Sequence, residues 1–215
     1  MNAEPALELR NVAFEYRIGR RFRASRRNRV FENLSLVVAR GEKLGITGSN
    51  GAGKSSLLML LAGTLAPTAG RIVNHCDSTA LLAMNLGMEP RLSGRINAIM
   101  HGLYLGYRRE QIQHLLPEIT AFAGLENVIE NPFYTYSSGM RARLSFSVAC
   151  HLKADLILID EMLSTGDQEF REKSRHAIRE MLKTSTAVIV SHNVQVLKDL
   201  CDRTLRLDQG GIQST

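Results

Sequence analysis

One short segment restricts the possible folds of this chain more than any other. Residues 48–55 read Gly-Ser-Asn-Gly-Ala-Gly-Lys-Ser, which matches the pattern GxxxxGK[ST]. Residues 43–47 predict a short strand before this segment, and residues 55–65 show the apolar spacing of a helix after it, closed by Pro67 and Gly70. A strand, a glycine-rich loop and a helix in this order predict a phosphate-binding loop in an α/β fold.

The residue types in this phosphate loop suit the chemistry of a triphosphate. Glycines let successive backbone N–H groups converge on phosphate oxygens, and the following helix adds its positive end. Lys54 supplies a charge for the β- and γ-phosphates, and the Ser55 hydroxyl can ligate Mg²⁺. The loop alone does not distinguish kinases, GTPases and ATPases. The predicted nucleotide-binding residues here are Gly48, Ser49, Asn50, Gly51, Ala52, Gly53, Lys54, Ser55 and Ser56.

Two later apolar runs predict strands that end beside this loop. Residues 156–159 and 187–190 are short and continuously apolar, which is typical of parallel strands covered on both faces. The first run ends in Asp160 and Glu161, and the second is soon followed by His192. Ligands of open α/β sheets bind at the carboxyl ends of strands. We therefore expect Asp160 to hold Mg²⁺, directly or through water, and Glu161 to orient or deprotonate the attacking water.

The remaining segments predict the domain organisation. Residues 7–16 and 34–38 carry apolar residues in patterns that predict two N-terminal strands. Between about residues 89 and 152 the pattern is mainly helical, which indicates a lobe inserted into the α/β core. We expect one domain, with a core of about residues 1–88 and 153–215.

Residues 136–140, Tyr-Ser-Ser-Gly-Met, lead into a predicted helix with apolar positions at Met140, Leu144, Val148 and Leu152. A helix N-terminus that exposes N–H groups and a serine is a second anion site. Since one chain needs only one phosphate cradle, the second suggests a composite site formed by two chains.

This signature segment, residues 136–140, resembles the signature motif of ABC ATPases, in the variant typical of those that export capsular polysaccharide, O-antigen or teichoic acid. The resemblance extends over most of the chain. It includes the phosphate loop (Walker A), residues 156–161 (Walker B), a D-loop-like segment at 164–167 and a switch-like segment at 191–193. It implies the α/β class, as a RecA-like P-loop NTPase core with an N-terminal antiparallel β-subdomain and an inserted α-helical subdomain.

The resemblance also implies roles for particular residues. Two subunits would pack head to tail, so that each ATP is held by the phosphate loop of one and by Ser137, Ser138 and Gly139 of the other. Asp167 would lie at that interface. His192 would contact the γ-phosphate and take part in hydrolysis with Glu161 and Lys54.

Two positions match the family less directly. Tyr16 stands where the A-loop aromatic would stack on adenine, and an ordinary strand-end tyrosine is the alternative. Glu89 stands where the family usually carries a glutamine that contacts Mg²⁺ and the membrane partner. Either this carboxylate serves Mg²⁺ or the loop does not reach the nucleotide. The chain stops soon after the switch-like segment, so we expect a short capsule-type subunit without a carbohydrate-binding domain.

The net charge of +6 arises from one stretch. Seven of the 27 basic residues are arginines between Arg17 and Arg29, with no acid among them, which leaves 20 basic against 21 acidic residues elsewhere. This arginine stretch could meet an anionic membrane face or an acidic substrate, or form a solvated hairpin. No apolar run approaches the roughly 18 residues that cross a bilayer, and residues 1–5 lack the features of a secretory signal. We expect a peripheral protein on the cytoplasmic side of the inner membrane.

These observations predict the ATP-hydrolysing subunit of an exporter for a cell-surface polysaccharide. The expected cofactors are ATP and Mg²⁺. The expected partners are a second copy of the chain and ABC-2-type permease subunits, which make most contacts with the cargo. One alternative is an ABC ATPase for another cargo, such as a drug or a lipid. A nucleic-acid-associated ABC ATPase would explain the arginine stretch, but the single ATPase core and the lack of a long coiled-coil insert disfavour it.

Overall fold

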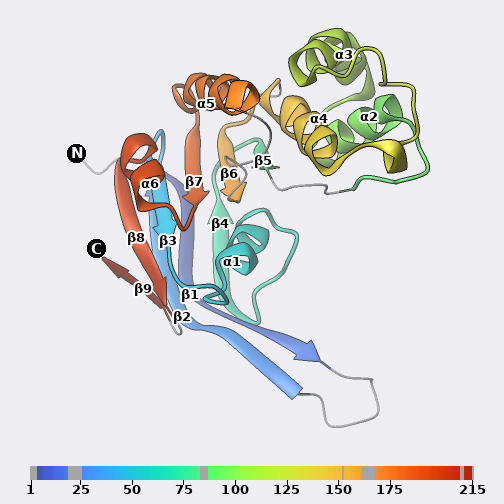
Figure 1. Ribbon diagram of the computed structural model, residues 1–215. Coiled ribbons are helices and arrows are strands. Elements are labelled where there is room, and N and C mark those ends of the chain that lie inside the picture. The colour runs from blue at the N-terminus through green and yellow to red at the C-terminus, as the bar shows by residue number, and fades with distance from the viewer. Residues whose placement is uncertain are drawn as a thin grey trace.

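A six-stranded sheet forms the core of the chain and positions the candidate site. The computed structural model describes residues 4–18, 26–82, 87–151, 153–160, 168–208 and 211–214. The sheet has the strand order β5-β6-β7-β3-β8-β9, and only β9 runs antiparallel to its neighbour (Figure 1). Its strands are β3 (Lys43–Thr47), β5 (Thr79–Leu82), β6 (Leu156–Asp160), β7 (Thr186–Val190), β8 (Arg203–Asp208) and β9 (Gly211–Ser214).

The order of the central strands brings the predicted segments together. β7 lies between β6 and β3, and all three run parallel. The carboxyl ends of β6, β7 and β3 therefore lie at the same edge of the sheet. Asp160 ends β6, His192 follows β7, and the phosphate loop follows β3. The convergence predicted from the two apolar runs is confirmed.

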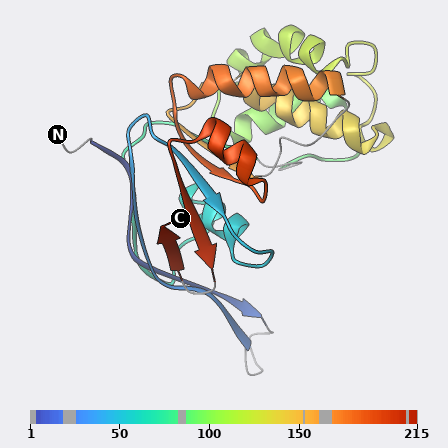
Figure 2. The same ribbon diagram turned by 60° about the vertical axis from the view of Figure 1, so that its left-hand side comes forward.

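A second, antiparallel sheet confirms the predicted N-terminal subdomain. It has the order β2-β1-β4 and consists of β1 (Pro5–Ile18), β2 (Arg26–Ala39) and β4 (Ala69–Asn74). The pairing of β1 with β2 continues to the ends of both strands, so they project from the body as a long ribbon (Figures 1 and 2). On this ribbon Arg27 lies 3.3 Å from Glu15, and Arg29 lies 2.7 Å from Glu32. The described part of the arginine stretch thus belongs to a hairpin with partly paired charges.

Alternation along the strands explains why the two runs are apolar throughout. Leu156 and Leu158 of β6 belong to the hydrophobic cluster that contains α1 (Lys54–Leu61) and the antiparallel sheet. Ile157 and Ile159 belong to the cluster on the other face, with residues of α5 (Gln168–Leu182) and α6 (Val194–Leu200). Because successive side chains of a strand point to opposite faces and both faces are covered, no position is left for a polar residue.

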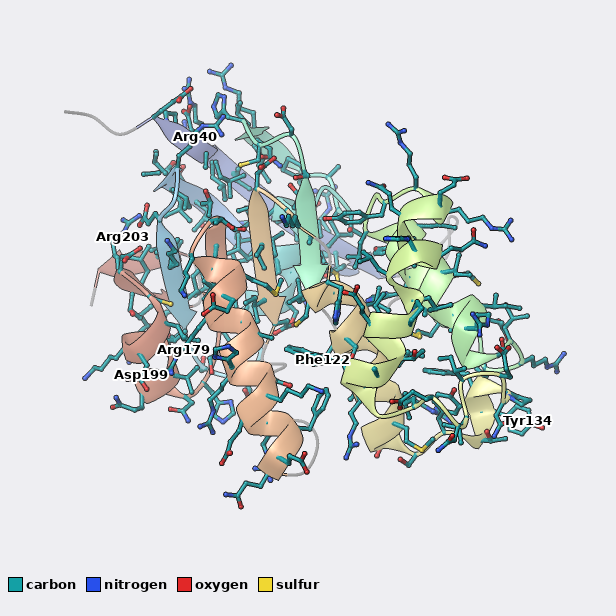
Figure 3. All side chains as sticks on the ribbon, turned by 90° about the horizontal axis from the view of Figure 1, so that it is seen from above. Arg40, Phe122, Tyr134, Arg179, Asp199 and Arg203 are labelled. Atoms are coloured by element: carbon teal, nitrogen blue, oxygen red, sulfur yellow. The ribbon has the colours of Figure 1, made fainter. Side chains whose placement is uncertain are left out.

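The helical lobe is inserted between β5 and β6, as predicted. Its elements are α2 (Gly94–Tyr104), α3 (Arg109–Ala123), the short 3₁₀ helix η1 (Phe133–Thr135) and α4 (Ser138–Cys150). An aromatic cluster joins the lobe to the core: the rings of Phe122 in α3 and Phe146 in α4 each lie 5.9 Å from that of Phe170 in α5 (Figure 3). Offset and edge-on pairs of this kind stabilise beyond their buried area, so α5 holds the lobe against the sheet.

One helix is shorter than predicted. The sequence suggests a helix over residues 55–65, closed by Pro67 and Gly70, whereas α1 ends at Leu61. Gly63 adopts a left-handed conformation with φ of 72°, and the N–H groups of Thr64 and Leu65 both donate to the carbonyl of Met59. A left-handed glycine with such bonds closes a helix at its C-terminus. The helix therefore ends about one turn before the predicted end at residue 65.

Among the helices of the described ranges, none has the length and apolar character needed to cross a bilayer.

Candidate functional site

The phosphate loop leads from β3 into α1 in the geometry that anion binding requires. Gly53 precedes α1 with φ of 96°, and no side chain caps the start of the helix. The first N–H groups of α1 are therefore available to an external acceptor, at the positive end of the helix. Lys54 Nζ donates to the carbonyl oxygens of Gly48 and Ser49, each at 2.8 Å. The ammonium group thus lies over the loop, beside the N–H groups that would receive a phosphate.

Two glycines of the loop are required by backbone geometry. At Gly48 a Cβ atom would lie 2.2 Å from the carbonyl oxygen of Leu207 in β8. At Gly53 it would lie 2.4 Å from Val30 of β2, and the positive φ adds strain for any other residue. The loop can therefore pass this closely between β8 and β2 only with glycine at these positions.

The residues predicted to ligate a metal from two separate motifs are in direct contact. The Ser55 hydroxyl in the first turn of α1 donates to Asp160 Oδ2 at the end of β6, at 2.9 Å. A hydroxyl and a carboxylate are oxygen ligands of the kind that Mg²⁺ prefers, and they lie next to the phosphate loop. The structure thus brings together two of the three residues predicted for the metal. Their role as ligands stays a prediction.

His192 lies at the same edge of the sheet. Asp160 and Val190 are register partners in β6 and β7, and the N–H of Ser191 donates to the carbonyl of Ile46 in β3 at 3.1 Å. The switch-like segment is thereby anchored directly beside the strand that enters the phosphate loop. His192 itself is exposed, as a side chain that approaches a bound ligand must be.

Tyr16 is close to the first turn of α1. Its hydroxyl lies 3.1 Å from Ser56 Oγ, and its ring packs edge-on against Phe14 at 4.8 Å. The side chain is 37% exposed. The structure therefore places an accessible aromatic ring beside the phosphate loop, as adenine stacking requires, and connects it with the predicted residue Ser56.

The signature segment begins a helix, as predicted. Ser137 caps α4, and its hydroxyl accepts a hydrogen bond from the N–H of Met140 at 3.2 Å. Arg141 fixes the segment by donating to the carbonyls of Tyr136 and Tyr134, both at 3.1 Å. A cavity of about 650 Å³ opens beside the helix start and is lined by Gly124, Leu125, Asn127, Val128, Ser137, Gly139, Met140 and Arg143.

Within one chain the signature segment and the phosphate loop lie on separate parts of the molecule. α4 belongs to the helical lobe, whereas α1 lies under the sheet of the core (Figure 1). The two helix starts that are predicted to bind anions therefore lie apart from each other, which is the arrangement that a composite site between two chains requires.

Glu89 is not placed beside the pair of Ser55 and Asp160 by any contact that the structure shows. Its carboxylate accepts the N–H of Arg91 at 3.3 Å, and its backbone is bound to Asn97 of α2. The side chain is exposed on its own loop. A metal contact by Glu89 stays a prediction. The predicted residues Glu161 and Asp167 lie outside the described residues.

No functional role was predicted for Asn97 from the sequence, although residues 92–97 belong to the resemblance to the family. It is fully buried, accepts the N–H of Glu89 at 2.7 Å and donates to the carbonyls of Glu89, Leu92 and Ser93 at 3.0–3.2 Å. A single amide thus fixes the loop that joins the core to the helical lobe.

We expect Asn97→Ala to destabilise the protein by about 1–3 kcal/mol, because the N–H of Glu89 loses its acceptor and the carbonyls of Glu89, Leu92 and Ser93 each lose one of their donors. The free energy of unfolding, measured with urea, checks this value. Gln113→Ala, at an exposed position of α3, is the matched control and should change stability little. Equal stability of the two variants would contradict the tethering role.

Comparisons with known sequences agree with this geometry. The family model described as ABC transporter matches residues 31–164. The O-antigen export system ATP-binding protein RfbB of Klebsiella pneumoniae is 37% identical over 197 residues, which cover 91% of this chain and 78% of that protein. The teichoic acids export ATP-binding protein TagH of Staphylococcus epidermidis is 34% identical over 220 residues, with coverage of 97% and 83%. The TagH protein of Shouchella clausii is 36% identical over 183 residues, and the chain spans about half of its length, 51%.

Comparison with solved structures concerns the fold. A dimeric ATP-binding cassette in a post-hydrolysis state, bound to ADP and Pi, matches with a TM-score of 0.78 at 20% identity. The match covers 97% of this chain and 98% of that chain. The predicted fold, with its antiparallel subdomain and inserted helical lobe, is therefore confirmed.

Proposed function

Since the chain belongs to the ABC transporter family, whose activity is ATP hydrolysis, we propose that it drives the export of a cell-surface polysaccharide. The cargo class is supported by the similar proteins, which are named for O-antigen export and teichoic acid export. A drug or lipid exporter would share the ATPase machinery, but these relatives favour a glycan.

The contact between Ser55 and Asp160 carries this proposal. It brings the phosphate loop and the end of β6 into one site, 2.9 Å apart, with β7 beside them. In our proposal Lys54 leaves the loop carbonyls and binds the β- and γ-phosphates of ATP, together with the N–H groups of the phosphate loop. Tyr16 stacks on adenine, at the opposite end of the ATP molecule from the γ-phosphate.

Hydrolysis is assigned to residues at the carboxyl ends of β6 and β7. Glu161, directly after Asp160, orients the attacking water and takes its proton. His192 binds the γ-phosphate from the neighbouring strand end. Ser55 and Asp160 fit the ligand preferences of Mg²⁺, which would neutralise charge between the β- and γ-phosphates when bound.

We propose that the active form is a head-to-tail pair of chains. The phosphate loop of one chain and Ser137, Ser138 and Gly139 of the other would hold each ATP, with Asp167 at the interface. The separate positions of α1 and α4 within one chain support this arrangement. Closure on ATP and opening after hydrolysis would then supply movement to the permease.

Gly139 allows a specific test of the composite site. A Cβ atom there would meet only Ser137 Oγ, at 3.9 Å, so the chain itself has room for a side chain. We expect Gly139→Asp to leave the melting temperature and the affinity of one chain for ATP nearly unchanged. Dimer formation and hydrolysis should be lost, because the new carboxylate faces the triphosphate of the partner. Analytical ultracentrifugation with ATP and a phosphate-release assay measure both effects.

A neutral side chain is the control for this variant. Gly139→Ala adds the Cβ without the charge and should retain dimer formation. Mixing Gly139→Asp with Lys54→Ala should restore some hydrolysis, because a mixed dimer has one site in which both contributing segments are intact. Hydrolysis at the wild-type rate by Gly139→Asp alone would contradict a shared site.

We propose that the permease binds the helical lobe at α2. Four large apolar residues on this helix are between 36% and 47% exposed: Ile96, Met100, Leu103 and Tyr104. The adjacent loop contains Glu89, which matches the family position that contacts the membrane partner. Asn97, on the buried side of α2, would couple movements of this helix to that loop.

The double variant Met100→Asp/Leu103→Asp should lose co-purification with the permease while retaining ATPase activity. Val37→Asp, an equivalent change at a 54% exposed position of β2, should retain binding. Unchanged co-purification of the double variant would exclude α2 as the contact. Binding to the permease would place the chain at the cytoplasmic side of the membrane. Within the single domain we propose a core of about residues 1–88 and 153–215 and a helical lobe of about residues 89–152.

A further inference from the structure

A cavity lined by arginines lies on the face of the sheet away from α1. It has a volume of about 370 Å³ and lies between α5 and α6, over the ends of β6 and β7. Arg171, Arg175 and Arg179 of α5 line it, four residues apart and thus on one side of that helix. Figure 3 shows Arg179 and Asp199 in the space between the two helices. We call this space the arginine cavity.

Among the described residues that line the arginine cavity, basic side chains outnumber acidic ones. Arg175 and Arg179 lie there with Arg171, and Asp199 is the acidic residue among these described lining residues, where it accepts a hydrogen bond from Gln195 at 2.9 Å. Within the described ranges, Arg175 and Arg179 have neither an ion pair nor a hydrogen bond. Like charges four residues apart destabilise a helix, and within the described residues no ion pair compensates this pair.

Size and spacing indicate what would compensate this charge. Four residues of helix separate Arg175 and Arg179 by about 6 Å along the axis, so both can reach one phosphate group or two linked ones. Arginine binds phosphate oxygens through paired N–H donors. A volume of about 370 Å³ is that of a small-molecule site and leaves no room for a folded partner.

We propose that the arginine cavity binds a small ligand with one or two phosphate groups, at a site separate from the phosphate loop. Ser191, His192 and Asn193 form one wall of the cavity. A ligand held by Arg175 and Arg179 would therefore contact the back of the switch-like segment, and its binding would be coupled to the position of His192.

Binding of inorganic pyrophosphate and of inorganic phosphate tests this site. Both are titrated into the protein while a saturating non-hydrolysable ATP analogue occupies the phosphate loop, and the melting temperature is followed. The wild type should show a saturable rise with pyrophosphate. Arg175→Gln/Arg179→Gln should weaken this binding roughly tenfold or more, since it removes charge-assisted hydrogen bonds. Both side chains are exposed, so the double variant should fold.

A control must distinguish binding in the arginine cavity from general electrostatic attraction of pyrophosphate to the protein surface. Arg71→Gln/Arg109→Gln removes the same charge at two exposed positions outside the cavity and should bind pyrophosphate as the wild type does. Saturable binding of phosphate alone would indicate the hydrolysis product as the source, and binding of pyrophosphate only would indicate a diphosphate ligand. Equal losses in both double variants, or no saturable binding in the wild type, would overturn the proposal. The assay needs neither ATP hydrolysis nor the permease, so a failure to bind pyrophosphate would leave the proposed export function standing.

Discussion

Replacing Glu161 with glutamine is expected to abolish turnover while leaving ATP binding intact. The amide cannot take a proton from water, and loss of a general base lowers kcat by roughly 10²–10⁴-fold. The groups that we propose bind the triphosphate, in the phosphate loop and at Ser55, are unchanged. ATP should therefore hold two chains together without being hydrolysed. Phosphate release gives the rate, and analytical ultracentrifugation with ATP should show an accumulated dimer.

The control for Glu161→Gln is the same substitution at a glutamate in the helical lobe, outside the proposed catalytic site. Glu118→Gln, on the exposed side of α3, should hydrolyse ATP as the wild type does. A monomeric Glu161→Gln protein at saturating ATP would contradict the composite site. A normal rate would instead remove Glu161 from catalysis and leave the metal pair of Ser55 and Asp160 as the remaining assignment.

The parts of this site that could be predicted from sequence are local or strictly periodic. The phosphate loop is a continuous motif, so its strand, turn and helix start follow from neighbouring residues. The runs at 156–159 and 187–190 indicate buried parallel strands because both faces of each are apolar. Parallel strands must end at the same edge, and this predicted the meeting of Asp160 with the segment of His192.

The features that sequence did not predict depend on contacts between distant segments. The hydrogen bond between Tyr16 and Ser56 joins β1 to α1 across 40 residues, and the spacing of neither segment encodes it. Asn97 looks like an ordinary helical residue until the loop around Glu89 folds onto it. The early end of α1 depends on the conformation of Gly63, which the more prominent Pro67 and Gly70 concealed. The arginine cavity depends on how α5 and α6 lie over the ends of β6 and β7.

Replacing Lys54 with alanine is expected to have the second large effect, on binding as well as on rate. In the structure the ammonium group donates to the carbonyls of Gly48 and Ser49. With ATP bound, the same donors would serve phosphate oxygens, where charge-assisted bonds of about 1.5–3 kcal/mol each are lost in the variant. Affinity for a fluorescent ATP analogue should fall by roughly 10²-fold or more, at 1.4 kcal/mol per tenfold change. Hydrolysis should be undetectable.

Lys43 provides a matched control for Lys54, because it makes the same kind of contact at the opposite end of the same strand. Its ammonium group donates to the carbonyl of Gly41 at 2.7 Å, at the edge of the sheet away from the phosphate loop. Lys43→Ala should therefore bind and hydrolyse ATP normally, although it removes an equal charge and an equivalent hydrogen bond. If both variants lost affinity equally, the effect would reflect net charge or the stability of β3. A loss confined to Lys54→Ala would locate the triphosphate at the start of α1, the position from which the proposed composite site and the role of Glu161 both follow.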